Sequence, residues 1–406
     1  MSKDPVPYMP DLSAPEVAQS PYRTYASLHE QGKVYWDERV QAWVVTSYQD
    51  CATILRDDRF SVVTMKIYLP RLPVESRELL MPLFNRLDTW MLFQNGDEHK
   101  RLRTPITKAF DSRLMKLWEG KVQDITNALL EPLEGQSEFD LLESLAYPLP
   151  LGIICAMLGL PTNDQSQLRQ WTTDIAQFID NSTNFEVASA ALASEKSISE
   201  YLRDQIARYR KEPADNLISY LLGLQEQNPE ISDEDIIGNA VLIFAAGHET
   251  TTALISNTTS LLCQHPAAQE AVVADPELMK GAVEEALRME PPVHRTGRIP
   301  KEDFNLRGVE IGKGERLSLI LGAANRDPAH FENPDSFDIT RRPNRHLAFS
   351  VGRHFCVGAH LARIQGIVGN RELFRRFPTL RMDPESIQWR PNLSLRSMTR
   401  CSMQIG

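Results

Sequence analysis

The sequence predicts a mainly α-helical protein with a small β region, and three observations support this fold class. Helix-period patterns with start and stop signals cover residues 98–210, with breaks near Gly135 and Pro148, and again residues 232–264. Runs rich in β-branched and aromatic residues are few and short. No Gly/Ser run, long charge block or repeat divides the 406 residues, so we expect a single domain over residues 1–406.

The first elements are a hairpin and a short helix. Residues 34–36 and 43–45 are β-rich runs around a polar turn, which is typical of a hairpin. Ser47 is a preferred N-cap residue and predicts a helix through Leu55. Residues 60–93 mix proline, aromatic and charged residues with weak periodicity, so we expect a mobile loop region with one short helix.

The later elements begin and end at recognisable signals. Residues 163–210 indicate two amphipathic helices joined near 181–184. Ser232 with Asp235 resembles a capping box, and the helix it opens runs to Gln264, on the order of 50 Å at ~1.5 Å per residue. A helix is expected from Pro276 to Pro291, and strands at 298–299, 304–309 and 316–321. A further helix and short strands complete the chain.

Composition excludes several classes of protein. The formal net charge is -10, which argues against a nucleic-acid partner. The five cysteines are scattered and odd in number, which fits a reducing compartment better than a disulfide framework. The first twenty residues are polar and proline-rich and carry neither a signal peptide nor a membrane anchor. We therefore expect a cytoplasmic protein.

The most informative segment is residues 349–358, which place Cys356 in a loop just before a helix pattern. Free N–H groups and the helix dipole favour a thiolate at such a position. Gly352 and Gly358 allow sharp turns, and Phe349 is placed to shield the sulfur. A lone cysteine is more often a buried small hydrophobe, but the fixed spacing of its neighbours favours a ligand.

The spacing Phe-x-x-Gly-x-His-x-Cys-x-Gly resembles the heme loop of the cytochrome P-450 family. The resemblance implies heme b, held non-covalently apart from a bond from Cys356 to iron. It also implies an all-helical triangular prism, with the heme between a long central helix and the helix of the cysteine loop, hence a heme-thiolate domain. This chain has Ser350 where the family usually has glycine, a change that leaves the ligand in place.

Residues 245–252 in the long helix resemble the family's oxygen-activation motif, Ala-Gly-x-Glu-Thr. A polar patch on an ordinary helix is the simpler interpretation of a threonine-rich run. The resemblance implies that Ala246 and Gly247 leave room for the cofactor or O2, with a local widening of the helix. It implies that Thr250 hydrogen-bonds the oxygen being activated and that Glu249 relays protons. His248 occupies a slot that tolerates many residues.

A second motif pairs Glu285 with Arg288 on one helix face. Such pairs are usually solvated and contribute little to stability. The flanking prolines and downstream loop match the family's Glu-x-x-Arg helix, which implies a buried structural pair with a third partner from residues 341–346.

The heme propionates require cations. His99 and Arg103 lie at i and i+4 on one helix face, Arg298 starts a strand, and His354 precedes Cys356 by two residues. Basic residues are mostly exposed, but all four occupy positions where the family binds propionates.

The resemblance implies a monooxygenase that uses O2 and two external electrons to hydroxylate or otherwise oxidise a mainly apolar small molecule, such as a bacterial secondary metabolite. No flavin or iron–sulfur motif is present, so ferredoxin and ferredoxin reductase are the expected donors of a monomeric enzyme. Arg101, Arg353 and Arg363 are candidates for a basic docking face. The expected pocket-lining segments are residues 61–93, 167–193, 241–246, 293–296 and 393–397.

Three alternatives remain open. A peroxide-driven peroxygenase keeps the heme, but members of that kind tend to lose the acid–alcohol pair that Glu249 and Thr250 form here. Desaturation, coupling and nitration use the same machinery. A non-catalytic heme carrier or gas sensor has no need of a proton relay.

Overall fold

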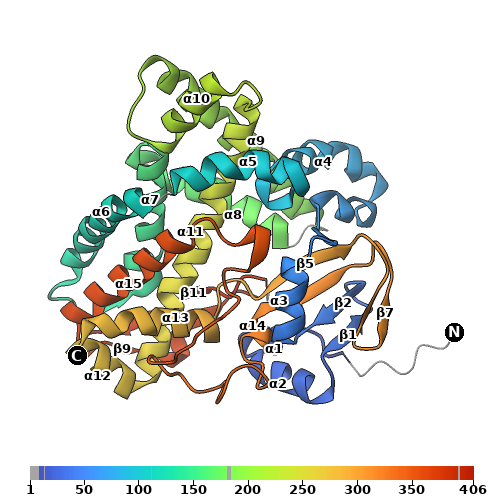
Figure 1. The fold of residues 1–406 in the computed structure, drawn as a ribbon. Coiled ribbons are helices and arrows are strands. Elements are labelled where there is room, and N and C mark those ends of the chain that lie inside the picture. Colours follow the sequence, from blue (N-terminus) through green and yellow to red (C-terminus); the bar gives the residue numbers. More distant parts are fainter. Residues whose placement is uncertain (1–8, 13, 111, 181–183, 392–393) are drawn as a thin grey trace. The chain divides into compact units, whose positions relative to one another are not determined.

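The computed structural model describes residues 9–12, 14–110, 112–180, 184–391 and 394–406. The chain divides into two compact units, which are described separately (Figure 1). Unit 1 comprises Met1–Val63, Leu130–Ala146 and Thr250–Gly406, and unit 2 comprises Thr64–Leu129 and Tyr147–Glu249. The expectation of a single domain over residues 1–406 stays a prediction.

Unit 1 is built on a five-stranded sheet in the order β1-β2-β8-β5-β3. β1 (Val34–Asp37) and β2 (Ala42–Val45) pair antiparallel, which confirms the predicted hairpin. β2 pairs in parallel with β8 (Leu317–Ile320), which pairs antiparallel with β5 (Arg295–Pro300). β3 (Phe60–Val62) completes the sheet beside β5.

Helix α3 (Tyr48–Arg56) covers this sheet through a shared apolar cluster. The Ser47 hydroxyl accepts a hydrogen bond from the Asp50 N–H at 3.5 Å, as the capping signal predicted. Cys51, Ile54 and Leu55 of α3 are buried with Val45 and other sheet residues. Burial of this apolar face fixes α3 on the sheet.

The remaining elements of unit 1 are mainly helical. In Figure 1, α13 and α15 lie side by side. The α-helices are α1 (Pro15–Gln19), α2 (Tyr22–Gln31), α12 (Pro266–Ala274), α13 (Met279–Met289), α14 (Leu321–Ala324) and α15 (Ala359–Arg376). The strands are β4 (Glu138–Asp140), β6 (Phe304–Leu306), β7 (Val309–Ile311), β9 (Arg381–Met382), β10 (Gln388–Trp389), β11 (Met398–Arg400) and β12 (Ser402–Gln404). Shorter 3-10 and π-helical turns are η3 (Glu131–Leu133), η4 (Leu142–Ala146), η6 (Pro276–Leu278), η7 (Gly352–His354) and η8 (Pro384–Ser386).

The described part of unit 2 is helical. Its α-helices are α4 (Val74–Leu87), α5 (Gly96–Ala109), α6 (Ser112–Leu130), α7 (Pro148–Leu158), α8 (Gln165–Asp180), α9 (Phe185–Lys211) and α10 (Leu217–Gln227). Its 3-10 turns are η1 (Met65–Arg71), η2 (Met91–Phe93) and η5 (Thr162–Asp164). α6 ends one residue inside unit 1, and the predicted junction between the two amphipathic helices lies partly outside the described residues.

Residues 60–93 are more ordered than the sequence predicted. They contain the 14-residue helix α4 in addition to β3 and two 3-10 turns. Leu80, Leu83, Phe84 and Leu87 form the buried side of α4, a 3-4 spacing that Pro82 and the charged residues around it obscure. Tertiary burial therefore stabilises a helix that local propensity does not.

Helix α11 (Asp233–Gln264) is the longest element, at 32 residues. The Ser232 N–H donates to the Asp235 carboxylate at 2.9 Å, and the Asp235 N–H donates to the Ser232 hydroxyl at 3.1 Å, so the predicted capping box is confirmed. The division between the units falls at Glu249 and Thr250. Among the described residues, no helix is both long and apolar enough to cross a membrane.

The expected widening of α11 over residues 245–252 is absent, because this stretch is regular α-helix. Hydroxyl groups further along show how the helix accommodates threonine. Thr258 and Thr259 donate to the carbonyls of Leu254 and Ile255 at 2.7 and 3.0 Å without interrupting the helix.

Candidate active site

The cysteine loop of unit 1 is closed by backbone hydrogen bonds. The Cys356 N–H donates to the Phe349 carbonyl at 2.9 Å, and the Ser350 N–H donates to the Leu347 carbonyl at 2.8 Å. Helix α15 begins at Ala359, with Gly358 as its N-cap. Cys356 therefore lies where N–H groups and the helix dipole favour an anionic sulfur.

Two residues of the loop adopt the left-handed conformation. Gly352 has φ +77°, and a Cβ there would lie 2.6 Å from the Leu55 carbonyl oxygen, so only glycine fits. Ser350 has φ +59°, and its buried hydroxyl has no hydrogen-bond partner among the described residues. Gly358 was also expected to need glycine's freedom, but its φ of -84° is open to any residue.

Cys356 differs from the other four thiols of the chain. Cys51, Cys155 and Cys401 are buried and Cys263 is partly buried, whereas Cys356 is exposed. Burial raises the pKa of Cys155, Cys263 and Cys401 to about 12 and that of Cys51 further. Those four remain protonated thiols, which leaves Cys356 as the cysteine suited to ligate a metal.

Phe349 is held by cationic and aromatic neighbours. The Arg363 guanidinium lies 4.5 Å from the centre of the Phe349 ring, and its Nε donates to Glu284 at 2.6 Å. The His346 ring lies 6.1 Å from the Phe349 ring. These contacts fix the ring that begins the cysteine loop.

The three arginines expected to form a basic docking face each pair with a carboxylate, and the docking face itself stays a prediction. Arg363 is bound to Glu284. Arg101 belongs to unit 2 and forms ion pairs with Glu98 and Asp235, the latter at 2.9 Å. Only Arg353 of the three is well exposed, at 61% of its side chain, and it pairs with Asp58. Carboxylates bind all three cations, and except for Glu98 these partners lie far away in the sequence.

Arg298 of β5 is a buried cation without a carboxylate among the described residues. It is 4% exposed, and its Nη1 donates to the Thr296 hydroxyl at 3.3 Å and the Gly297 carbonyl at 2.7 Å. Burial lowers the pKa of Arg298 to about 10. A buried charge needs a counter-ion, and a heme propionate would supply one. His354, in the same unit, is partly buried within η7.

Unit 2 carries the other two predicted propionate ligands. His99 and Arg103 lie one turn apart on α5. His99 is buried and Arg103 partly buried. Their side chains are thus withdrawn from solvent, as residues that bind an enclosed anion must be.

The oxygen-motif residues of α11 have distinct surroundings. Glu249 is 2% exposed, and its Oε1 accepts a hydrogen bond from the Thr173 hydroxyl of α8 at 3.1 Å. Thr250 is partly buried, and Ala246 is exposed. Sequence reasoning missed Thr173, because a threonine on an amphipathic helix carries no signal of its partner.

Gly247 and His248 both face protein within unit 2. A Cβ at Gly247 would lie 2.9 Å from Cδ1 of Ile154 of α7, so the missing side chain allows α11 and α7 to pack closely. The expected role of Gly247 in leaving room for the cofactor stays a prediction. His248 is fully buried, with its ring 5.9 Å from the Tyr147 ring. Close helix packing accounts for both residues.

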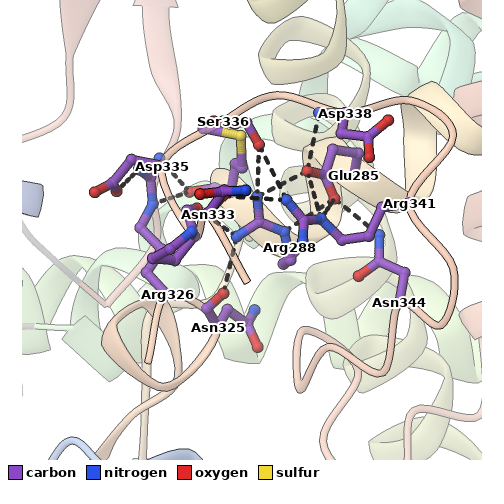
Figure 2. Close-up of polar contacts among 12 residues, drawn as sticks. Glu285, Arg288, Asn325, Arg326, Asn333, Asp335, Ser336, Asp338, Arg341 and Asn344 are labelled. Atoms are coloured by element: carbon purple, nitrogen blue, oxygen red, sulfur yellow. Dashed lines mark hydrogen bonds and ion pairs between the residues drawn. The ribbon is translucent and has the colours of Figure 1, made fainter. Parts of the chain in front are cut away.

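Glu285 and Arg288 form a fully buried ion pair at 2.7 Å in α13. Figure 2 shows Arg288 and Arg341 converging on the Glu285 carboxylate. The Arg341 Nε donates at 3.0 Å and the Asn344 amide at 3.0 Å, so residues 341–346 supply two partners where one was expected. Arg288 also donates to the carbonyls of Asn325, Pro334 and Ser336. The pair thus ties the segment preceding the cysteine loop to α13.

Comparisons with known proteins agree with this arrangement. A sequence profile described as Cytochrome P450 matches residues 76–398. The chain is 34% identical over 385 residues to the biotin biosynthesis cytochrome P450 of Bacillus subtilis (strain 168), covering 94% of this chain and 95% of the relative. It is 35% identical over 394 residues to the cytochrome P450 monooxygenase PikC of Streptomyces venezuelae, covering 94% and 90%. The crystal structure of P450BioI in complex with a hexadec-9Z-enoic acid ligated acyl carrier protein superposes with a TM-score of 0.90 and 33% identity, covering 97% of this chain and 100% of the other.

The fold and these matches define a heme-thiolate oxidoreductase. The chain belongs to the cytochrome P450 family, as its cysteine loop predicted, and it binds heme b. The exposed Cys356 thiol and the buried Arg298 cation are donors of the kinds that iron and propionates require.

Proposed function

We propose that this enzyme inserts one oxygen atom of O2 into a mainly apolar small molecule, with two electrons supplied by a ferredoxin and its reductase. The substrate RH, O2, two electrons and two protons give ROH and water. When bound, heme b supplies the activation of O2. Cys356 is the proposed iron ligand, and His99, Arg103, Arg298 and His354 are the proposed propionate ligands.

The observation that carries the proposal is the buried carboxylate of Glu249, beside the Thr250 hydroxyl in the sequence. The hydrogen bond from Thr173 keeps Oε1 of Glu249 in one position within unit 2. In our proposal Glu249 accepts a proton from solvent and passes it to Thr250. The Thr250 hydroxyl then donates at the oxygen that leaves as water. A buried relay delivers protons singly while water stays excluded.

Location and substrate class follow from further features. None of the five cysteines, all of which lie among the described residues, forms a disulfide, and this supports a reducing cytoplasm. The biotin-biosynthesis relative acts in biosynthesis by its name, and the P450BioI structure contains an acyl chain; both support a secondary metabolite or acyl-chain substrate. The aromatic and aliphatic residues of the 61–93 segment suit such a molecule.

The test is a screen of apolar compounds for shifts of the ferric heme spectrum, followed by turnover of the hits. We expect product only with both O2 and the ferredoxin system, and label from isotopic O2 in the product. Equal turnover with hydrogen peroxide alone identifies a peroxygenase instead. Tight binding without any product identifies a carrier or sensor.

A further inference from the structure

Arg295, the first residue of β5, is a partly buried cation without a carboxylate partner among the described residues. Its Nε donates to the Ser394 hydroxyl at 2.7 Å. That hydrogen bond holds the guanidinium and leaves Nη1 and Nη2 without an acceptor in the described part of the chain. Arginine fixed through Nε presents two N–H groups in a plane, which is the geometry that binds a carboxylate.

Five other arginines withdrawn from solvent in unit 1 behave differently, since each of these contacts a carboxylate, whereas Arg298 is assigned above to a heme propionate. Their partners lie 2.6 to 3.2 Å away. These pairs are Arg288–Glu285, Arg326–Asp335, Arg341–Glu285, Arg363–Glu284 and Arg396–Glu290. The protein supplies a carboxylate to each of these five arginines but none of the described carboxylates to Arg295, so Arg295 is suited to an anion from outside the chain.

The position of Arg295 favours a substrate as that anion. The backbone joins the two segments expected to line the pocket: the His294 N–H donates to the Ser394 carbonyl at 3.0 Å, and Val293 bridges to Leu395. His294 is fully buried, with Nδ1 3.0 Å from the Tyr25 hydroxyl. Successive side chains of an extended chain alternate, so Arg295 lies on the face opposite to this buried contact.

We infer that Arg295 binds the free carboxylate of an amphipathic, long-chain substrate. This inference rests on the proposed monooxygenase function and specifies its substrate class. Ser394 orients the guanidinium, and the two Nη groups bond the two carboxylate oxygens. An acyl chain tethered to a carrier protein has an uncharged thioester in place of that carboxylate. Binding by Arg295 therefore predicts that this enzyme accepts the free acid and does not require a tethered chain.

The experiment compares dodecanoic acid with its methyl ester as ligands of the purified holoenzyme. Binding is followed by the shift of the ferric heme spectrum in wild type, Arg295→Gln and Arg295→Lys. Arg400→Gln, an exposed arginine of β11, is the matched control. Heme content per chain is measured for each variant.

We expect wild type to bind the acid more tightly than the ester. Arg295→Gln should weaken acid binding by ~10- to 100-fold, the usual effect of losing hydrogen bonds to a charged group, and change ester binding less than ~2-fold. The acid affinity of Arg295→Lys should fall between those of wild type and Arg295→Gln. Arg400→Gln should bind both ligands as wild type does. Ser394→Ala should weaken acid binding more than ester binding, because it frees the guanidinium to rotate.

Three results overturn the inference. The first is equal binding of acid and ester by wild type, or no binding of any acid from octanoic to hexadecanoic. The second is unchanged acid binding in Arg295→Gln. The third is a matched loss of both ligands with reduced heme content, which assigns Arg295 to a propionate. Failure of the monooxygenase proposal is distinguished separately, because the spectral titration measures binding without turnover: wild type would then bind the acid but form no product with O2 and the ferredoxin system.

Discussion

Replacing Arg298 by methionine separates the cost of a buried cation from its benefit to cofactor binding. Burial lowers the pKa of Arg298 from the ordinary value of arginine to about 10. At ~1.4 kcal/mol per tenfold change in proton affinity, this corresponds to ~3 kcal/mol of destabilisation of the charged form in the protein without heme. Neutral pH lies below the pKa of Arg298 in both the folded and the unfolded chain, so the full cost applies there. It disappears as pH rises from about 10 toward the ordinary pKa of arginine.

The hydrogen bonds from Arg298 to Thr296 and Gly297 return part of that cost, at ~1 kcal/mol each. We therefore expect apo Arg298→Met to be more stable than the apo wild type by ~1 kcal/mol in urea unfolding. The holo variant should lose heme to an acceptor protein at least ~10-fold faster. Arg400→Met, on the exposed side of β11, should change neither measurement. An Arg298→Met variant that retains heme as long as wild type would refute the propionate role.

Further predictions address the ion pair, the relay and the loop. Glu285→Gln leaves Arg288 in a buried site with its charge uncompensated, so we expect a loss of ~3–5 kcal/mol in the free energy of unfolding by urea; a loss below ~1 kcal/mol would contradict the importance of the pair. The Thr250→Ala variant should consume electrons but form less product per electron than wild type. An unchanged ratio of product to electrons would exclude Thr250 from proton delivery. Thr173→Val should lower that ratio partly and Thr173→Ser should restore it, because only the hydroxyl bonds Glu249. Ser350→Gly should stabilise the protein by ~1 kcal/mol, since φ +59° strains any residue but glycine; a lower melting temperature would show that the hydroxyl has a partner in the holoenzyme.

Local signals in the sequence predicted the parts of the fold that depend on neighbours in the chain. Ser47 caps α3 and Ser232 caps α11, because each hydroxyl bonds an N–H three residues later. The hairpin of β1 and β2 likewise depends on a short turn. Helix α4 was missed because its stability comes from burial of its apolar face, which Pro82 masks in the pattern.

The candidate site shows the same difference between features set by neighbours in the chain and features set by distant residues. The cysteine loop was found because its turns, its glycine at Gly352 and its helix start are adjacent in sequence. The partners of Glu285 lie 56 and 59 residues away, at Arg341 and Asn344, so only the fold could select them. Thr173 stands 76 residues before Glu249 and has no distinguishing neighbours. The sequence alone therefore identifies the residues of the motifs, and the structure adds the side chains that hold them.

The ligation of heme by Cys356 is tested most directly by the absorption spectrum of the reduced carbon monoxide complex. Wild type should show the red-shifted Soret band of a thiolate-ligated heme, and Cys356→Ala should lose that band while Cys263→Ala keeps it. A wild type without the band, or a Cys356→Ala variant that retains it, would contradict the account at its centre.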